Sequence, residues 1–336
     1  MFRLFVNCNG PLNEIVTHDQ LAPEVYGAIY SMLYYIQNKE LHLLSAAVRI
    51  RGPDAYTYLQ GQFTQDLNRP PGTVFYGLWL NEKGKVIADS HVLRLGENDF
   101  QIISPALSGS ALRERLEACL VADEVSVEDE SDSWALVSLW GEGAALAMTG
   151  LSGPAPLPGN WTESRGLRTF AGRRSPTESR EFLFPPSAEA EVCAALAVSG
   201  AQQVDAATAE RERILGAQPA VPVDIGPRDL PNEGGLEKVA ISYTKGCYLG
   251  QEVMARLKNL GQFRRRLHVV RGPGEPPVSG EALYQTGRKV GEFRSSASDG
   301  TGFVAMAMLS LVAMQPGEGL ARTPESEPSI RILRRV

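Results

Sequence analysis

The stretch Lys-Gly-Cys-Tyr-Leu-Gly-Gln-Glu, residues Lys245–Glu252, brings a lysine, a thiol and a carboxylate into one short segment. Two glycines flank the Cys–Tyr pair, and glycine permits backbone angles that other residues rarely adopt. The segment can therefore bend and present the Cys247 thiol to a ligand or a partner. The nearby Lys245 would favour the reactive thiolate form, which makes Cys247 and Lys245 candidate catalytic residues. The next residues predict a helix over 251–257, whose N-terminus would add positive potential near the sulfur.

Together with Ala255 and Arg256, this segment closely resembles the signature of the YgfZ family. Members of that family are folate-binding proteins that assist iron–sulfur cluster assembly and repair. They are related to the glycine-cleavage aminomethyltransferase, or T-protein. The resemblance covers roughly residues 42 to 310. It includes the segment before the signature (Leu230–Glu233), a first helix (Tyr58–Leu67) and a hairpin (Gly84–Asp89).

The resemblance implies an α+β fold like that of the T-protein, with two α+β lobes around a central folate cavity and a small C-terminal β-barrel. The sequence pattern agrees, because strands and helices interleave in the first two thirds of the chain and short strands separated by glycine turns follow. We expect residues 1–31 to be an N-terminal extension outside the fold. Residues 32–260 would form the folate-binding region, and residues 261–336 the barrel.

The same resemblance points to ligand-binding residues around the cavity. Tyr248 could stack on a pterin ring, or it could be an ordinary core tyrosine. Gln251 and Glu252 could hydrogen-bond the edge of a pterin, or they could cap their own helix. Asp89, on the second strand of the predicted hairpin, is implied to face the cavity, and the alternative is an exposed strand position.

Basic residues gather between positions 256 and 266 in an otherwise acidic chain. Arginine forks bind carboxylates through two parallel hydrogen bonds, so Arg256 and Arg265 are candidates for holding the glutamate tail of a folate. The alternative is a solvated strand edge, on which basic side chains discourage aggregation.

Two departures from the family pattern bear on the folate site. The T-protein carries an acidic residue that helps to hold the folate ring, but this chain has Leu215 there, so Glu233 or Glu210 would have to replace it. The T-protein also has paired aspartates in its hairpin, where this chain has Ala88 before Asp89. Because group transfer needs a general base near the transferred carbon, these losses argue against aminomethyltransferase activity.

Composition argues against several other classes of protein. The net charge of −6 does not favour non-specific nucleic-acid binding. The four cysteines are widely separated, without a CxxC pair or a histidine at metal-ligand spacing, so we expect no metal site. No apolar run of about 18 residues predicts a membrane helix. Since the N-terminus also lacks the features of a signal peptide, we expect a cytoplasmic protein.

We therefore expect a tetrahydrofolate-binding accessory factor for iron–sulfur cluster assembly or repair. Tetrahydrofolate or a one-carbon derivative would occupy the cavity, with Cys247 at its rim, and the partners would be iron–sulfur assembly or client proteins. Two alternatives stay open. One is a folate-dependent transferase of the aminomethyltransferase type. The other is a non-catalytic interaction scaffold whose folate cavity has decayed, for which Leu215 is the main argument.

Overall fold

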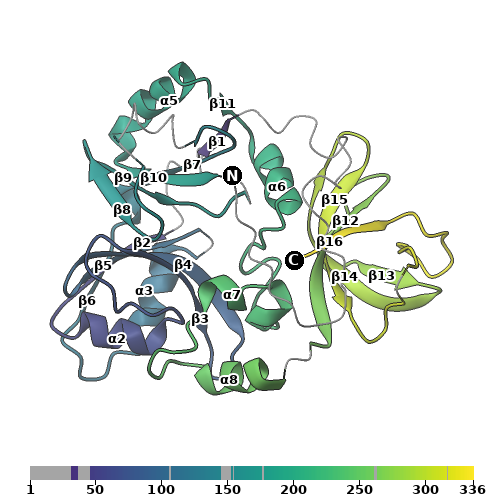
Figure 1. Ribbon diagram of the computed structural model, residues 1–336, viewed down its shortest axis with the longest axis horizontal. Coiled ribbons are helices and arrows are strands. Elements are labelled where there is room, and N and C mark those ends of the chain that lie inside the picture. Colours follow the sequence, from purple (N-terminus) through teal and green to yellow (C-terminus); the bar gives the residue numbers. More distant parts are fainter. Residues whose placement is uncertain are drawn as a thin grey trace, which may run out of the picture.

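The computed structural model describes residues 32–36, 46–105, 107–144, 153, 155–175, 178–260, 263–315 and 317–336. The predicted N-terminal extension, residues 1–31, lies outside the described residues. Three β-sheets with helices on their faces form the described part of the chain, as Figure 1 shows. The α+β class predicted from the sequence is confirmed.

The first lobe, residues 46–129, is an antiparallel sheet with the strand order β3-β4-β5-β2-β6. Helices α2 (Ala55–Gln62) and α3 (Gly109–Glu117) bury Leu59 and Leu112 against this sheet. Its strands are β2 (Ala46–Arg51), β3 (Val74–Leu80), β4 (Val86–Gly96), β5 (Asp99–Ser104) and β6 (Ser126–Asp129). The β3–β4 hairpin was predicted, whereas α2 ends well before the predicted residue Leu67.

The second lobe, residues 32–36 and 135–215, is a six-stranded sheet with the order β11-β1-β7-β10-β9-β8. Helix α5 (Glu189–Val198) covers one face through Val192 and Leu196, and α6 (Ala206–Leu215) follows it. The strands are β1 (Leu33–Ile36), β7 (Ala135–Trp140), β8 (Trp161–Ser164), β9 (Leu167–Ala171), β10 (Ser179–Phe184) and β11 (Gln202–Gln203). Short 3-10 turns occupy Ser131–Ser133 and Pro186–Ala188.

An apolar cluster joins the two lobes. It consists of side chains from the sheets of both lobes, namely Ala47, Leu93, Ile103, Leu136, Phe170 and Leu183. All six are buried, so the second face of each sheet is covered by the other lobe. This contact explains why β7 is buried along its whole length, and it fixes the lobes around the space between them.

The return segment, residues 216–260, runs from α6 back to the first lobe. It contains a 3-10 turn (Pro231–Gly234), α7 (Glu237–Ala240) and α8 (Gln251–Leu260). Figure 1 shows α7 between the first lobe and the C-terminal sheet. One core cluster accordingly includes Leu78 from β3, Met254 from α8 and Met306 from the C-terminal sheet.

The C-terminal sheet is antiparallel, with the order β13-β14-β15-β12-β16. Isolated bridges from Tyr284 to Ala321 and from Leu320 to Ile330 connect segments near its two edges. Its strands are β12 (Arg265–Gly272), β13 (Ala282–Gln285), β14 (Arg288–Ser298), β15 (Phe303–Ser310) and β16 (Arg331–Arg335).

Strand β14 carries a β-bulge. Phe293 pairs with Ala307 and Ser296 pairs with Ala305, so two residues of β14 lie opposite a single residue of β15. Bulges of this kind bend a strand and redirect its side chains.

Candidate functional site

A cavity of about 300 Å³ lies where the two lobes meet α6 and the start of the return segment. Its polar lining comes from all three parts: Tyr76, Asp89 and His91 from the first lobe; Tyr35, Ser138, Arg173, Arg174 and Glu181 from the second; Glu210, Arg213 and Gln218 from α6 and beyond. Small-molecule sites are typically concave and combine apolar surface with convergent polar groups, and this cavity adds apolar residues such as Ile103, Leu136 and Phe170 to an unusually polar lining.

Asp89 occupies one end of the cavity. Because side chains alternate along β4, Asp89 and His91 face the cavity while Ala88 packs into the core of the first lobe. The Tyr76 hydroxyl donates to Asp89 Oδ2 over 2.9 Å. Asp89 Oδ1 is buried and has no hydrogen-bond partner among the described residues. Burial raises the pKa of Asp89 to about 6, although Tyr76 and Arg173 act in the opposite direction.

His91 and Arg173 complete this end of the cavity. The His91 ring centroid lies 5.2 Å from that of Tyr76 and 5.1 Å from that of Phe170. The Arg173 guanidinium carbon lies 4.0 Å from the centroid of the Tyr76 ring. Burial, assisted by Arg173, lowers the pKa of His91 to about 3, so the imidazole is neutral at physiological pH.

Glu181 is a second buried carboxyl group in the cavity lining. Its Oε2 accepts a hydrogen bond of 2.6 Å from the Ser138 hydroxyl. Burial raises the pKa of Glu181 to about 7, against the opposing effects of Arg174 and Ser138. Arg174 lies over the Tyr35 ring, 5.3 Å from its centroid, and its buried Nε has no partner among the described residues.

The consecutive residues Arg173 and Arg174 both line the cavity from the connection between β9 and β10. Each of them lies over a tyrosine ring, Arg173 over Tyr76 and Arg174 over Tyr35, and each acts on the pKa of a buried carboxyl group. An acceptor on Asp89 and a donor on Arg174 remain without partners among the described residues. The arrangement suits a planar ligand that both donates and accepts hydrogen bonds, because unpaired buried polar groups are costly.

The raised pKa of Asp89 predicts how the stability of the folded protein depends on pH. Its pKa in the folded protein lies above the ordinary value of about 4, so the folded state holds this proton more tightly and loses stability as pH rises from about 4 to 7. Asp89→Asn removes this loss and should raise the ligand-free stability at pH 7.5 by roughly 1–3 kcal/mol, with little gain at pH 4.5. Urea unfolding of the variant and of the native chain at pH 4.5 and at pH 7.5 measures this gain in stability. Exposed Asp132→Asn is the control, and a gain that is equal at both pH values would contradict the expectation.

Lys245 makes its contacts with the first lobe. Its ammonium donates to the backbone oxygens of Gln60, Phe63 and Gln65 over 2.8, 2.7 and 2.9 Å. An ammonium has three donors, so none is left for a thiolate at Cys247. Burial lowers the pKa of Lys245 to about 8. The residue therefore pins the signature segment to the end of α2 instead of activating the thiol.

Cys247 is exposed and is not among the residues that line the cavity. The expected place at the cavity rim is thus not supported by the lining. Gly250 has φ +87°, and a side chain there would meet the Asn81 carbonyl oxygen at 2.9 Å, so glycine is required where the segment approaches the hairpin turn. Gly246 has open space around it and no positive φ, so its predicted backbone role has no counterpart in the structure.

The other predicted pterin contacts of the signature segment lie outside the cavity lining. Tyr248 is 6 % exposed and packs in the core with Leu78, which is the alternative reading of that residue. The Gln251 side chain donates to the Lys245 and Gly246 carbonyl groups over 3.5 Å. Glu252 and Arg256 form an exposed ion pair on α8 at 3.0 Å.

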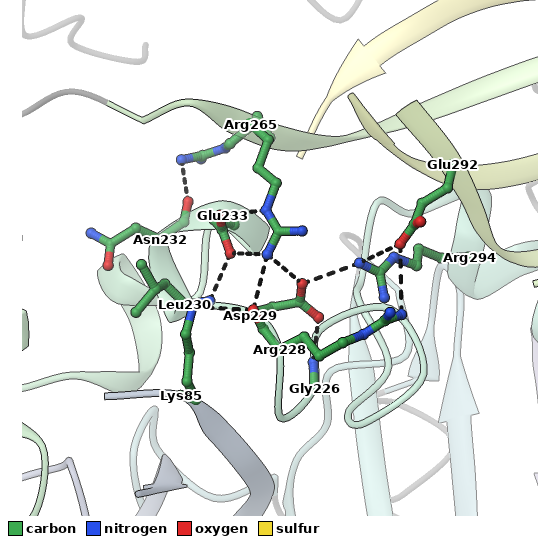
Figure 2. Close-up of polar contacts among 11 residues, drawn as sticks. Lys85, Gly226, Arg228, Asp229, Leu230, Asn232, Glu233, Arg265, Glu292 and Arg294 are labelled. Atoms are coloured by element: carbon green, nitrogen blue, oxygen red, sulfur yellow. Dashed lines mark hydrogen bonds and ion pairs between the residues drawn. The ribbon is translucent and has the colours of Figure 1, made fainter. Parts of the chain in front are cut away.

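Glu233 and Arg265 bind each other instead of lining the cavity, as Figure 2 shows. Arg265 Nε donates to Glu233 Oε1 over 2.6 Å, and Nη2 donates to Oε2 over 3.0 Å and to Asp229 Oδ1 over 2.9 Å. This pair ties β12 to the return segment. Glu233 therefore lies outside the cavity lining, whereas Glu210, the other candidate for the place of the missing acidic residue, lines it. Leu215 packs on the core shared with the C-terminal sheet.

Sequence reasoning missed most of the cavity. Tyr76 could have been found, because it precedes Asp89 on the predicted hairpin and strand alternation can place both on one face. The doublet Arg173-Arg174 between two strands was a further signal. Glu181 gave no signal of its own, since it begins an apolar strand segment and only the packing of the lobes shows what it faces.

Over the described ranges, no group of three or more His, Cys, Asp or Glu side chains is arranged to hold a metal ion. Within the same residues, no helix is long and apolar enough to cross a membrane. Cys119 and Cys193 are half-buried cysteines that pack at the edges of the two lobe cores.

Comparisons with known proteins define the class first. Residues 44–158 match the family model of the GCVT N-terminal domain, and residues 264–324 match that of the CAF17 C-terminal beta-barrel domain. The structure of the glycine cleavage system aminomethyltransferase T from Bartonella henselae superimposes with a TM-score of 0.76 at 19% identity, over 93% of this chain and 87% of that one. The protein thus has the aminomethyltransferase T fold, which confirms the predicted fold.

Two groups of relatives then identify the family. The tRNA-modifying protein YgfZ of Vibrio atlanticus is 27% identical, over 74% of this chain and 73% of its own length. The human mitochondrial iron-sulfur cluster assembly factor IBA57 is 28% identical, over 78% of this chain and 74% of its own length. The chain is thus a homologue of YgfZ and IBA57 over most of its length, which confirms the resemblance seen in the signature segment.

Proposed function

We propose that the protein binds tetrahydrofolate, or a one-carbon derivative of it, in the cavity between the lobes, and that it assists iron–sulfur cluster assembly or repair. The observation that carries the folate part is Asp89 Oδ1, a buried acceptor without a partner among the described residues, in a cavity lined by aromatic rings. A buried acceptor without a protein partner favours a ligand that supplies a donor to it.

The chemistry of a folate fits the groups present. A pterin is a planar ring with adjacent N–H donors on one edge, and a carboxylate such as Asp89 or Glu181 can accept from two of them. The rings of Tyr76 and Phe170 offer apolar faces for stacking. Arg174 has a free buried donor that suits a ring acceptor or a carboxylate of the glutamate tail. Three carboxyl groups line the cavity, those of Asp89, Glu181 and Glu210, so Leu215 does not leave it without acceptors.

The iron–sulfur part rests on the relatives. IBA57 proteins from mouse and human carry the name of iron–sulfur cluster assembly factors, and they align with more than three quarters of this chain. We extend that role to this protein, with iron–sulfur assembly or client proteins as partners. The cytoplasmic location stays a prediction, because the relatives include mitochondrial proteins.

Cys247 keeps its candidate role in a changed form. Its thiol is exposed on a segment that Lys245 and Gly250 hold in place, and it lies outside the cavity lining. We infer that it acts toward a partner protein at the surface, while the folate is bound by a different set of residues.

The test is a calorimetric titration with tetrahydrofolate under anaerobic, reducing conditions. We expect one-to-one binding by the native chain and at least about tenfold weaker binding by Asp89→Asn, because a hydrogen bond to a charged group contributes about 1.5–3 kcal/mol. The matched control is Glu252→Gln, an exposed position that should bind normally. In cells that lack the native protein, the native chain and Glu252→Gln should restore the activity of an iron–sulfur enzyme, and Asp89→Asn should restore less of it.

The outcomes separate the three functions. Saturable binding that Asp89→Asn weakens supports the proposal. No binding by the native chain would contradict the folate part and favour the interaction scaffold. Production of methylene-tetrahydrofolate from a loaded lipoyl carrier would show the aminomethyltransferase-type alternative instead.

A further inference from the structure

The bulge in β14 directs two adjacent side chains, Arg294 and Ser295, at the return segment. Arg294 Nη2 lies 3.1 Å from Asp229 Oδ1, a contact drawn in Figure 2. The Ser295 amide and hydroxyl both donate to Asp224 Oδ1, over 3.0 and 2.6 Å. In a regular strand these neighbours would face opposite sides, so the bulge is what allows both contacts.

Asp224 connects the C-terminal sheet to the residues that line the cavity. The residue is fully buried, and its second oxygen, Oδ2, accepts from Arg213 Nη1 over 2.7 Å and from the Ala220 amide over 2.8 Å. One carboxylate therefore joins the C-terminal sheet, the return segment and α6.

Arg213 holds the wall of the cavity. Its Nε and Nη2 donate to the two oxygens of Glu210 over 2.8 and 2.5 Å, and its Nη1 donates to the Gln218 carbonyl oxygen over 2.5 Å. Asp224 accepts a further hydrogen bond from Nη1, and the Ser295 hydroxyl accepts one from Nη2 over 2.7 Å. All five N–H groups of Arg213 therefore have a partner. The Gln218 side chain in turn accepts from Arg173 Nη2 over 3.3 Å.

We propose that Ser295 and Asp224 are positioning residues for the ligand cavity, so that the C-terminal sheet sets the position of Glu210 and Gln218 in its wall. The identity of the ligand rests on the proposed function, but the positioning does not. Removing the Ser295 hydroxyl takes one acceptor from Arg213 and one donor from Asp224. The guanidinium group is then held less firmly, and Glu210 moves with it because two of its bonds are to Arg213.

A separate network keeps the C-terminal sheet in place in such a variant. Arg265, Arg294, Asp229 and Glu233 bind one another across the same junction without Ser295 (Figure 2). Ser295→Ala should therefore fold. Ser296→Ala is the matched control, because the Ser296 hydroxyl donates to the Pro277 carbonyl oxygen over 2.7 Å and does not contact Asp224 or Arg213.

The experiment is a double-mutant cycle in tetrahydrofolate affinity, measured by calorimetry. We expect Ser295→Ala and Glu210→Gln each to weaken binding about tenfold, and the double variant to be little weaker than either single one. Ser296→Ala should bind like the native chain. Losses that multiply in the double variant would show that Ser295 does not act through Glu210, and an unchanged affinity of Ser295→Ala would overturn the proposal.

Hydrogen exchange of the ligand-free proteins separates this proposal from the folate assignment. Amides in residues 206–224 should exchange several-fold faster in Ser295→Ala than in Ser296→Ala, while those of β4 stay unchanged. If the native chain binds no folate, the proposed function fails, and the exchange pattern alone decides on the positioning. Equal exchange over residues 206–224 in both variants would overturn it whatever the ligand.

Discussion

Replacing Asp224 with asparagine is expected to lower the free energy of unfolding by about 3–5 kcal/mol, the range found when one partner of a buried ion pair is removed. The carboxylate is fully buried and accepts four hydrogen bonds, from Arg213, Ala220 and the amide and hydroxyl of Ser295. An asparagine amide has one oxygen and one NH2 group. The NH2 group would face donors, and Arg213 would lose one of its two charged partners, the one that joins three structural parts.

The measurement is urea unfolding followed by far-UV circular dichroism and tryptophan fluorescence. Asp205→Asn is a matched control on the neighbouring helix, because Asp205 caps the exposed N-terminus of α6 and asparagine caps a helix about equally well. That variant should leave the urea midpoint unchanged. If Asp224→Asn has the same urea midpoint as the native chain, the hydrogen bonds of Asp224 contribute little to the stability of the fold.

The second large effect concerns Lys245→Met. Methionine has a similar length but cannot donate, so the carbonyl groups of Gln60, Phe63 and Gln65 would lose a charged donor in a site that is 8 % exposed. Bonds to charged groups contribute about 1.5–3 kcal/mol each, and the saved cost of burying an ammonium offsets part of the loss. We expect a net destabilisation of about 3 kcal/mol and faster hydrogen exchange over residues 241–250.

Lys238→Met is the control for this variant, since Lys238 is an exposed residue of α7 in the same return segment. It should unfold like the native chain. If Lys245→Met kept native stability and exchange but lost function in cells, Lys245 would act chemically, as the sequence predicted, and not as an anchor.

The parts of the fold that the sequence predicted are those set by local pattern. The helix predicted over 251–257 is present as α8, which begins at the predicted residue and ends at Leu260. The hairpin before Asp89 was also predicted from its turn residues and alternation. Strand β1 was missed, since four residues in an apolar stretch carry no turn signal and depend on distant partners.

The site was harder to predict than the fold. The segment containing Cys247 identified the family, but its residues serve the surface and the core, and only Asp89 among the proposed ligand-binding residues lines the cavity. A lysine beside a cysteine suggests an activated thiol, yet the acceptors of Lys245 lie far earlier in the chain. Likewise, Glu233 and Arg265 each resembled a ligand contact, although their charges neutralise each other.

The place of β1 bears on the order in which the chain can fold as it is synthesised. Strands β2 to β6 of the first lobe are close in sequence, so their pairing can begin once residue 129 has left the ribosome. Strand β1 emerges before all of them, yet it pairs with β7 on one side and with β11 on the other. Both partners are synthesised only after the strands of the first lobe, and non-local pairings of this kind form slowly. Strand β1 therefore stays unpaired while the first lobe is synthesised, and the sheet of the second lobe forms only when β7 and β11 are available.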